Sequence, residues 1–192
     1  MIWLIHIGLA AADAVIGGSE NSAALVQVGL PWNLARVHYP LSKPFNLVGE
    51  YQVANYTRHQ AFFGINQMYI DKKWRLTGDL FGGYLYQNGQ LDQRGIAGEL
   101  RLRTGKTKGR ARPWFSLGSH HLLLRNETIL QTKSGEDKTI DTEHVWSLTG
   151  AMGLVIPIPK NLSLVTGIDF PWIPVPNPSI PGIHLALCWS AS

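Results

Sequence analysis

Cysteine and charge are both scarce in this chain of 192 residues. The single cysteine, Cys188, excludes an internal disulfide framework and a cysteine-based metal site. Charged residues make up 16% of the sequence, against roughly a quarter in soluble globular domains. This composition argues against a disordered chain, a coiled coil and a highly charged cytosolic protein.

The sequence also lacks an apolar run long enough for a membrane-spanning helix. The longest stretch, from Ile2 to Ala12, falls well short of the about 20 residues that such a helix needs. It leads into Ala12-Asp13-Ala14, a small-x-small triplet typical of a signal peptidase site. We therefore predict a signal peptide over residues 1–14 and a single domain over 15–192, the alternative being an apolar N-terminal strand or a short buried helix.

Motifs for phosphate and metal binding are missing as well. The sequence contains no glycine-rich phosphate loop, and its histidines are scattered without ligand spacing. We predict no metal and no cofactor.

The net charge of +4 is modest, and six basic residues between Arg101 and Arg112 straddle one predicted turn rather than a broad face. No nucleic-acid partner is expected; we interpret this basic turn as solvated, with a contact to lipid phosphates as the alternative.

What the chain does contain is period-two patterning from residue 22 onward, broken by turn residues such as Gln87-Asn88-Gly89. This pattern predicts strands. We place them at 22–31, 34–39, 45–56, 61–70, 74–86, 96–103, 113–124, 144–155, 161–170 and 182–189. Ten strands put both chain ends on one side; eight strands are the alternative if 22–39 does not hold two of them.

The alternation has one apolar face and one face of small and charged residues. Several predicted strands reach 10 to 13 residues, close to the about 9–11 that a tilted membrane strand needs. Aromatic residues recur at strand ends. Together these features favour an all-β, antiparallel, up-and-down transmembrane β-barrel with its apolar face outward. The alternative is a soluble lipocalin-like barrel or sandwich that buries the apolar face.

Two sets of residues are predicted to carry the structural roles of such a barrel. Inward-facing charges should form a lumenal ion-pair network that closes a narrow pore, which argues against a general diffusion porin; these are Glu50, Arg75, Asp79, Glu99 and Arg101. Tryptophans at strand ends should lie at the membrane interfaces; these are Trp32, Trp74, Trp114, Trp146, Trp172 and Trp189.

The longest connector, 125–143, is polar and charged. Long connectors suit the extracellular side of a membrane barrel, whereas short turns suit the periplasmic side. We expect this segment to protrude as a hairpin and to be available to protein partners.

The final stretch from Gly182 to Trp189 carries a glycine, apolar residues at alternate positions and a late aromatic. It is similar to the terminal strand of the small outer-membrane barrels of Gram-negative bacteria, the OmpA-type and OmpX-type group, which residues 22–189 resemble in pattern. The resemblance implies location in the bacterial outer membrane, with its lipid as a partner.

Ser119, His120 and His121 are the only candidates for chemistry. Lipid A deacylases of the outer membrane use a serine and a histidine on a barrel strand. Adjacent strand residues face opposite sides, so Ser119 shares a face with His121. We favour non-catalytic roles, His120 in the lumen and His121 at the interface, with a lipid A-modifying hydrolase as the alternative. The expected function is a structural, interaction or anchoring role, with a narrow channel or lipid-handling barrel and a soluble ligand-binding barrel as alternatives.

Overall fold

A computed structural model describes residues 23–30, 32–42, 44–54, 58–87, 92–132, 135–159, 161–173 and 182–190. They form ten strands: β1 (Ala23–Leu30), β2 (Trp32–Ser42), β3 (Phe45–Ala54), β4 (Arg58–Asp71), β5 (Trp74–Gln87), β6 (Asp92–Lys106), β7 (Arg112–Thr132), β8 (Gly135–Ile158), β9 (Leu162–Ile173) and β10 (Gly182–Ser190). The predicted ten strands are confirmed, and eight are excluded. Among the described residues no helix is long and apolar enough to cross a membrane. The predicted signal peptide, 1–14, lies outside them.

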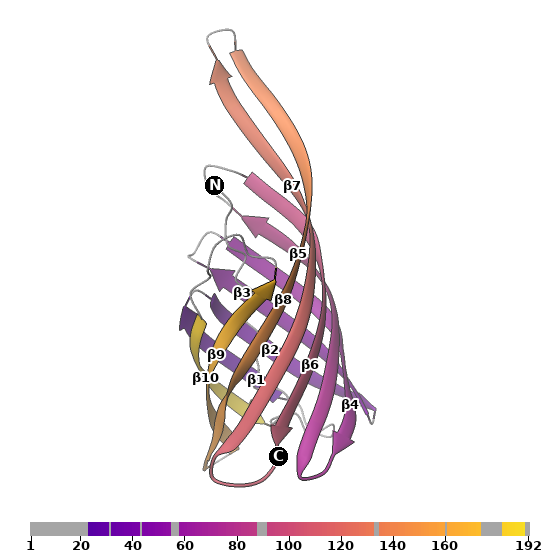
Figure 1. Cartoon of the computed structure of the whole chain (residues 1–192), viewed down its shortest axis with the longest axis vertical. Helices are drawn as coiled ribbons and strands as arrows, with labels where there is room; N and C mark the ends of the chain where they lie inside the picture. The colour runs from indigo at the N-terminus through magenta and orange to yellow at the C-terminus, as the bar shows by residue number, and fades with distance from the viewer. Residues whose placement is uncertain are drawn as a thin grey trace.

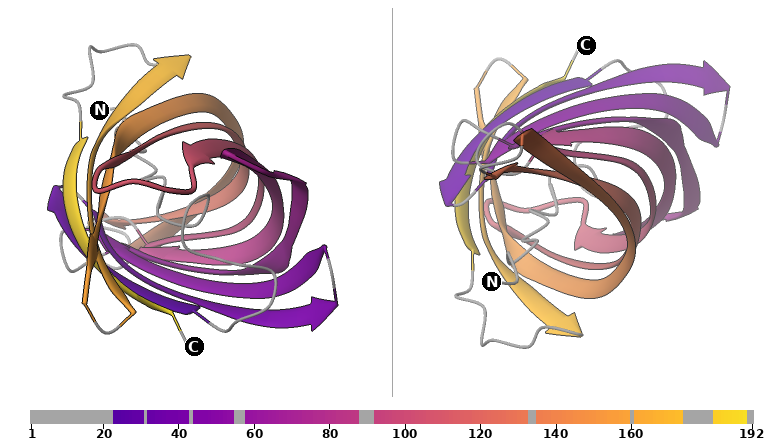
Figure 2. Two further views of the ribbon diagram at one scale, coloured as in Figure 1. Left: turned by 90° about the horizontal axis from the view of Figure 1, so that it is seen from below. Right: turned by 90° about the horizontal axis from the view of Figure 1, so that it is seen from above.

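Every strand pairs antiparallel with the next one in the chain, and β1 pairs with β10 to close the barrel. The closing register runs without a shift from Ala23↔Ser190 to Leu30↔Ile183. Viewed along the long axis, the strands form a continuous ring around the lumen (Figure 2). Closure pairs the first and last strands, so that neither is left as an open edge of the sheet.

The two ends of the barrel differ in how far the strands extend. One end holds the start of β1, the end of β10 and the four connections β2–β3, β4–β5, β6–β7 and β8–β9, which are two to five residues long. We call it the short-turn end. At the opposite end β7 and β8 continue as a hairpin beyond the other strands (Figure 1). Their register runs unbroken from Arg112↔Val155 to Thr132↔Gly135.

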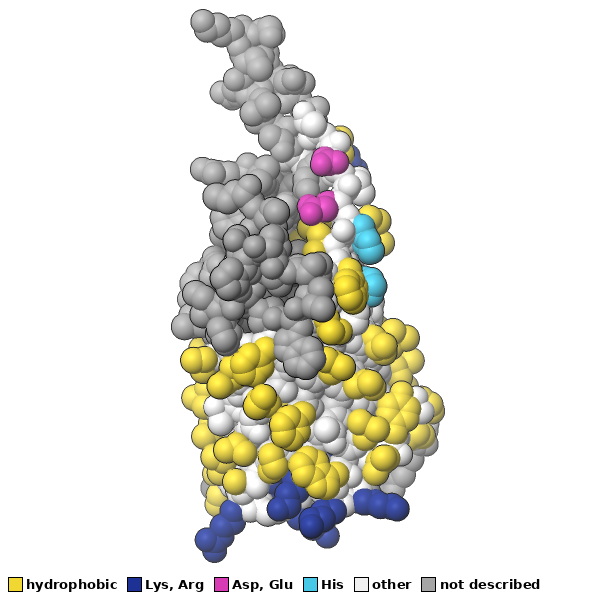
Figure 3. Space-filling model, in the orientation of Figure 1, with side chains coloured by type: hydrophobic (Ala, Val, Ile, Leu, Met, Phe, Trp, Pro, Cys, Tyr) yellow, Lys and Arg dark blue, Asp and Glu magenta, His cyan; other side chains and the backbone are white. Residues whose placement is uncertain are grey.

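Alternate residues of each strand face the lumen and the outside. On β5, Thr77, Asp79 and Phe81 are buried, whereas Leu80 and Tyr84 are exposed. The same sense holds around the barrel, where large apolar side chains such as Val26, Val37, Phe63, Ile96 and Leu185 are exposed. On the face seen in Figure 3, hydrophobic side chains cover the lower part of the barrel as an apolar belt, with Lys and Arg gathered below it.

The interior is filled by charged and polar side chains together with two apolar clusters. One cluster, on β1, β2 and β7–β10, includes Trp114 and Val165. The other, on β3–β7, includes Phe62, Phe81 and Leu122. The lumen is therefore partly polar and partly apolar.

Candidate functional site

The centre of the lumen holds a group of ion pairs that begins with Arg36 on β2 and Glu50 on β3. These two residues are register partners on adjacent strands. Arg36 Nη1 donates to Glu50 Oε2 at 2.9 Å, and Arg36 Nε donates to His38 Nε2 at 2.9 Å. The side chains of both charged residues are fully buried.

Arg101 on β6 connects this pair to a strand that is three positions away from β3 in the sheet. Its Nη1 and Nη2 lie 3.2 and 3.4 Å from the two carboxylate oxygens of Glu50. Its Nε donates to Glu99 Oε1 at 2.6 Å, on the same strand and the same face. Because β3 and β6 are not neighbours in the sheet, the contact between Arg101 and Glu50 crosses the lumen.

Asp79 on β5 forms ion pairs with Arg103 and also with Arg36. Arg103 Nη2 lies 2.5 Å from Asp79 Oδ2, and Arg36 Nη2 lies 3.3 Å from Asp79 Oδ1. Asn66 donates to Asp79 Oδ1 at 2.6 Å. Glu99 in turn lies 3.6 Å from Nδ1 of the buried His120.

Three arginines and three carboxylates thus form one buried cluster, which we call the lumenal ion cluster: Arg36, Glu50, Asp79, Glu99, Arg101 and Arg103. Its formal charges balance. The ring of Phe81 lies 5.1 and 5.2 Å from the guanidinium carbons of Arg36 and Arg101, within the range of a cation–π interaction. Buried charges are tolerated when they are paired in this way.

Four of the five residues predicted for the network lie in this cluster. The fifth, Arg75, lies half-buried on the same face of β5, near the short-turn end, where it pairs in register with Gly105. The predicted network did not include Arg36 and Arg103. Arg36 stands opposite Glu50 in the β2–β3 register, and Arg103 alternates with Glu99 and Arg101. Strand parity could have identified both.

Trp114 requires a correction. It was predicted to lie at a membrane interface, but its side chain is fully buried. It shares the inward face of β7 with Ser116 and His120, and its register partner on β8 is Gly153. A Cβ at Gly153 would lie 2.7 Å from the Trp114 ring and 1.9 Å from a carbonyl oxygen of β9. The missing side chain of Gly153 therefore makes room for the indole.

The other predicted tryptophans divide into two groups. Trp74, Trp146 and Trp189 are 40%, 40% and 49% exposed, and Trp74 and Trp189 lie at the short-turn end of their strands. The side chains of Trp32 and Trp172 lie outside the described residues.

Ser119 and His121 lie together on the outer face, as strand parity predicts. Ser119 Oγ is 3.2 Å from His121 Nε2, and Trp146 Nε1 donates to the same hydroxyl at 2.9 Å. The His121 ring stacks on His144 at 5.9 Å. Catalytic use of this serine would require a base held in place by a third group. His121 contacts the Ser119 hydroxyl and the rings of His144 and Trp146, and these four residues form a cluster on the outer face.

The segment 125–143, predicted as a protruding connector, forms most of the β7–β8 hairpin. Pairing of β7 with β6 ends at Glu127↔Asp92, and pairing of β8 with β9 ends at Leu148↔Ile173. Beyond these points the two strands pair only with each other among the described residues. In this described part of the chain no group of three or more His, Cys, Asp or Glu is placed to hold a metal ion.

Solved structures with a similar arrangement are outer-membrane β-barrels. The N-terminal β-barrel domain of OprF from Pseudomonas aeruginosa is 12% identical, over 88% of this chain and 96% of that chain, with a TM-score of 0.40. Neisserial surface protein A is 14% identical, over 88% of this chain and 92% of that chain, with a TM-score of 0.34. No protein-family model and no curated protein matches the sequence.

Proposed function

We propose that this chain is an integral outer-membrane barrel whose lumen is closed, and that it anchors the β7–β8 hairpin at the cell surface. The observation that carries the proposal is the contact of Arg101 with Glu50, which joins non-adjacent walls of the lumen inside a charge-balanced cluster. A pore would need a continuous aqueous path through this level of the barrel.

Membrane insertion is supported by the apolar outer face and the charged inner face of the barrel. Leu80 and Ile96 are 65% and 62% exposed on the outer surface, while the six residues of the lumenal ion cluster are buried inside. Soluble monomers rarely expose a contiguous apolar patch of more than a few hundred Å². The hydrocarbon core of a membrane provides an apolar environment for these outward side chains. The hydrogen bonds between neighbouring strands of the closed barrel satisfy the backbone donors and acceptors of the paired residues.

Conductance measurement separates a closed anchor from a narrow channel. The barrel would be refolded into vesicles, shown to be folded by heat-modifiable gel mobility, and transferred to planar bilayers. We expect no stable open state. A steady, ion-selective conductance that changes in a Lys108→Gln variant at the barrel mouth would instead establish a channel and refute the anchoring role.

The hairpin orientation has its own test. Thr139 on the hairpin and Lys108 at the short-turn end are both exposed, and the native Cys188 is buried. In intact cells a membrane-impermeant maleimide should label Thr139→Cys and leave Lys108→Cys unlabelled until the outer membrane is permeabilised. Labelling in the reverse order would place the hairpin in the periplasm and remove its proposed role.

A further inference from the structure

An apolar groove of about 410 Å³ lies on the outer face of β5–β9, near the short-turn end. Its lining includes Leu102, Thr104, Phe115, Leu117, Met152 and Phe170. Its volume falls within the about 300–1,000 Å³ of small-molecule sites.

The groove has a local cause in the sequence. Gly150 on β8 pairs with Leu117 on one side and with Phe170 on the other. Inward and outward residues alternate, and these three share the outward face. A glycine between two large side chains leaves a hollow at its position, and the side chains on either side form its walls.

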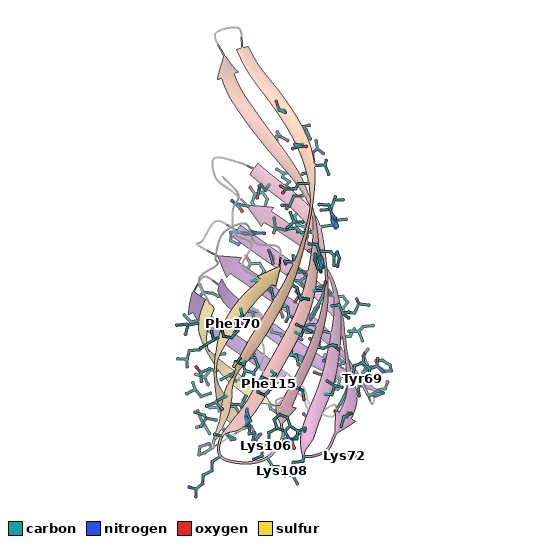
Figure 4. The ribbon with its side chains drawn as sticks, viewed as in Figure 1. Tyr69, Lys72, Lys106, Lys108, Phe115 and Phe170 are labelled. Carbon is teal, nitrogen blue, oxygen red and sulfur yellow. The ribbon has the colours of Figure 1, made fainter. Side chains whose placement is uncertain are left out.

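Basic side chains lie immediately beyond the groove. Lys106 is two residues from Thr104 on the same outward face of β6, a rise of about 7 Å. Lys108 and Arg110 follow in the β6–β7 turn and are exposed. Figure 4 shows Phe115 between Phe170 and the two lysines along the long axis of the barrel.

The basic end is also held together across strands. Thr107 N donates to the carbonyl oxygen of Lys73 at 3.1 Å, and Thr107 Oγ1 lies 2.8 Å from the carbonyl oxygen of Lys72. The β4–β5 and β6–β7 turns are thereby tied to each other. The lysines of both turns project from one connected rim rather than from two independent loops.

We propose that this groove and rim bind an anionic phospholipid: one acyl chain lies along the groove, and the headgroup phosphate contacts Lys106 and Lys108. A phosphate needs cationic donors just outside the apolar layer, and an acyl chain needs an apolar channel running inward from them. In this barrel the lysines lie at the short-turn end, and the apolar groove begins next to them and runs toward the middle of the barrel. A free phosphate would use the lysines but not the groove, and a neutral lipid the groove but not the lysines.

The inference rests on the proposed membrane location, because a phospholipid reaches the groove only from the bilayer leaflet at the short-turn end. It goes beyond that location by assigning lipid class and headgroup contacts. The arrangement with cationic residues below an apolar belt is visible in Figure 3.

Native mass spectrometry of the refolded full chain tests the proposal. Folded barrel would be equilibrated with equimolar phosphatidylglycerol and phosphatidylcholine of identical acyl chains, and the retained lipids counted. We expect preferential retention of phosphatidylglycerol. In Lys106→Gln/Lys108→Gln the preference should fall by about fivefold for each lysine, from the roughly 1 kcal/mol that a basic side chain contributes near an anionic surface.

Two further variants separate the headgroup and the chain contributions. Arg94→Gln/Arg125→Gln removes the same charge from exposed residues at the opposite end and should leave the preference unchanged. Thr104→Phe fills the groove while keeping both lysines, and it should reduce retention of both lipids. Added inorganic phosphate should not displace the retained lipid.

The inference is overturned if phosphatidylglycerol and phosphatidylcholine are retained equally, if both double variants lose the preference alike, or if Thr104→Phe retains lipid as the wild type does. Displacement by inorganic phosphate would reassign the lysines to a free-anion site. If the chain forms no heat-modifiable barrel in lipid, the proposed function is refuted before any lipid is counted. That result is distinguishable from a folded barrel that does not prefer phosphatidylglycerol, which refutes only the lipid-binding inference.

Discussion

Arg101→Met is the sharpest perturbation of the lumenal ion cluster. Arg101 makes contacts of 3.2 and 3.4 Å with Glu50 and of 2.5 and 2.6 Å with Glu99. Methionine preserves much of the side-chain length and removes the charge. After the substitution Glu50 still has Arg36 at 2.9 Å, whereas Glu99 retains His120 at 3.6 Å.

The expected loss of stability follows from the stranded carboxylate. All the side chains that contact Arg101 in the cluster are almost completely buried, so bulk water does not solvate the freed charge. Removing one partner of a buried ion pair typically costs about 3–5 kcal/mol. Because Glu50 keeps a second arginine, most of this cost should arise at Glu99.

Urea-induced unfolding of the barrel in lipid vesicles measures the effect, followed by tryptophan fluorescence and by heat-modifiable gel mobility. Arg94→Met removes an exposed arginine from the same strand and should shift the free energy of unfolding by less than about 0.5 kcal/mol. Arg101→Met should lower it by several kcal/mol under identical conditions.

A double variant determines whether the cost is electrostatic. Glu99→Gln/Arg101→Met removes the stranded charge together with its partner, so it should be more stable than Arg101→Met alone, with a coupling energy within the range of about 0.5–3 kcal/mol seen for contacting residues. If Arg101→Met unfolds like the wild type, or if the double variant is the sum of its single changes, the cluster does not hold the lumen as argued.

Three other changes test separate parts of the barrel. Gly153→Val should prevent formation of the heat-modifiable species, because its Cβ would collide with backbone and with the indole of Trp114, whereas Gly82→Ala has open space and should fold normally on the same gel. Trp114→Ala should lower the free energy of unfolding by about 3–5 kcal/mol, and by more than Trp189→Ala, whose ring is half exposed; equal losses in urea titrations would contradict its lumenal packing role. Replacing 128–139 by a two-residue turn should leave the unfolding midpoint unchanged, because pairing with β6 and β9 ends below this segment; a lower midpoint would show that the hairpin supports the barrel.

The number of strands, their order and most of their inward faces could be predicted from the sequence because these follow from local rules. Side chains alternate with a period of two, turn residues interrupt the pattern, and the parity of the strands brings both chain ends to one side. Parity placed Glu50, Asp79, Glu99 and Arg101 on the polar face, and the strand lengths and strand-end aromatics favoured that face as the lumenal one. The same rule applied to β7 places Trp114 inside; the expectation that tryptophan marks an interface overrode it and was wrong.

The length of β7 and β8 was underestimated for a different reason. Their outer parts are polar and carry no apolar face, so the pattern that identifies a membrane strand stops near Leu124 and resumes near His144. The two segments pair with each other across the intervening residues. Such pairing depends on backbone hydrogen bonds, which leave no apolar periodicity in the sequence.

The alternation of apolar and polar residues, the low charge and the single cysteine could be recognised in the sequence, and together with the strand lengths they favoured a barrel that encloses its charged face. Which charged side chains contact one another depends on how the strands are arranged in the barrel. The curvature of the barrel turns the inner faces of β3 and β6 toward each other although β4 and β5 lie between them, so Arg101 reaches Glu50, 51 residues away in the chain. The registers of β7 with β8 and of β8 with β9 set Gly150 between two large outward side chains. These contacts depend on strand stagger and barrel radius, which arise from all ten strands together and from no single segment.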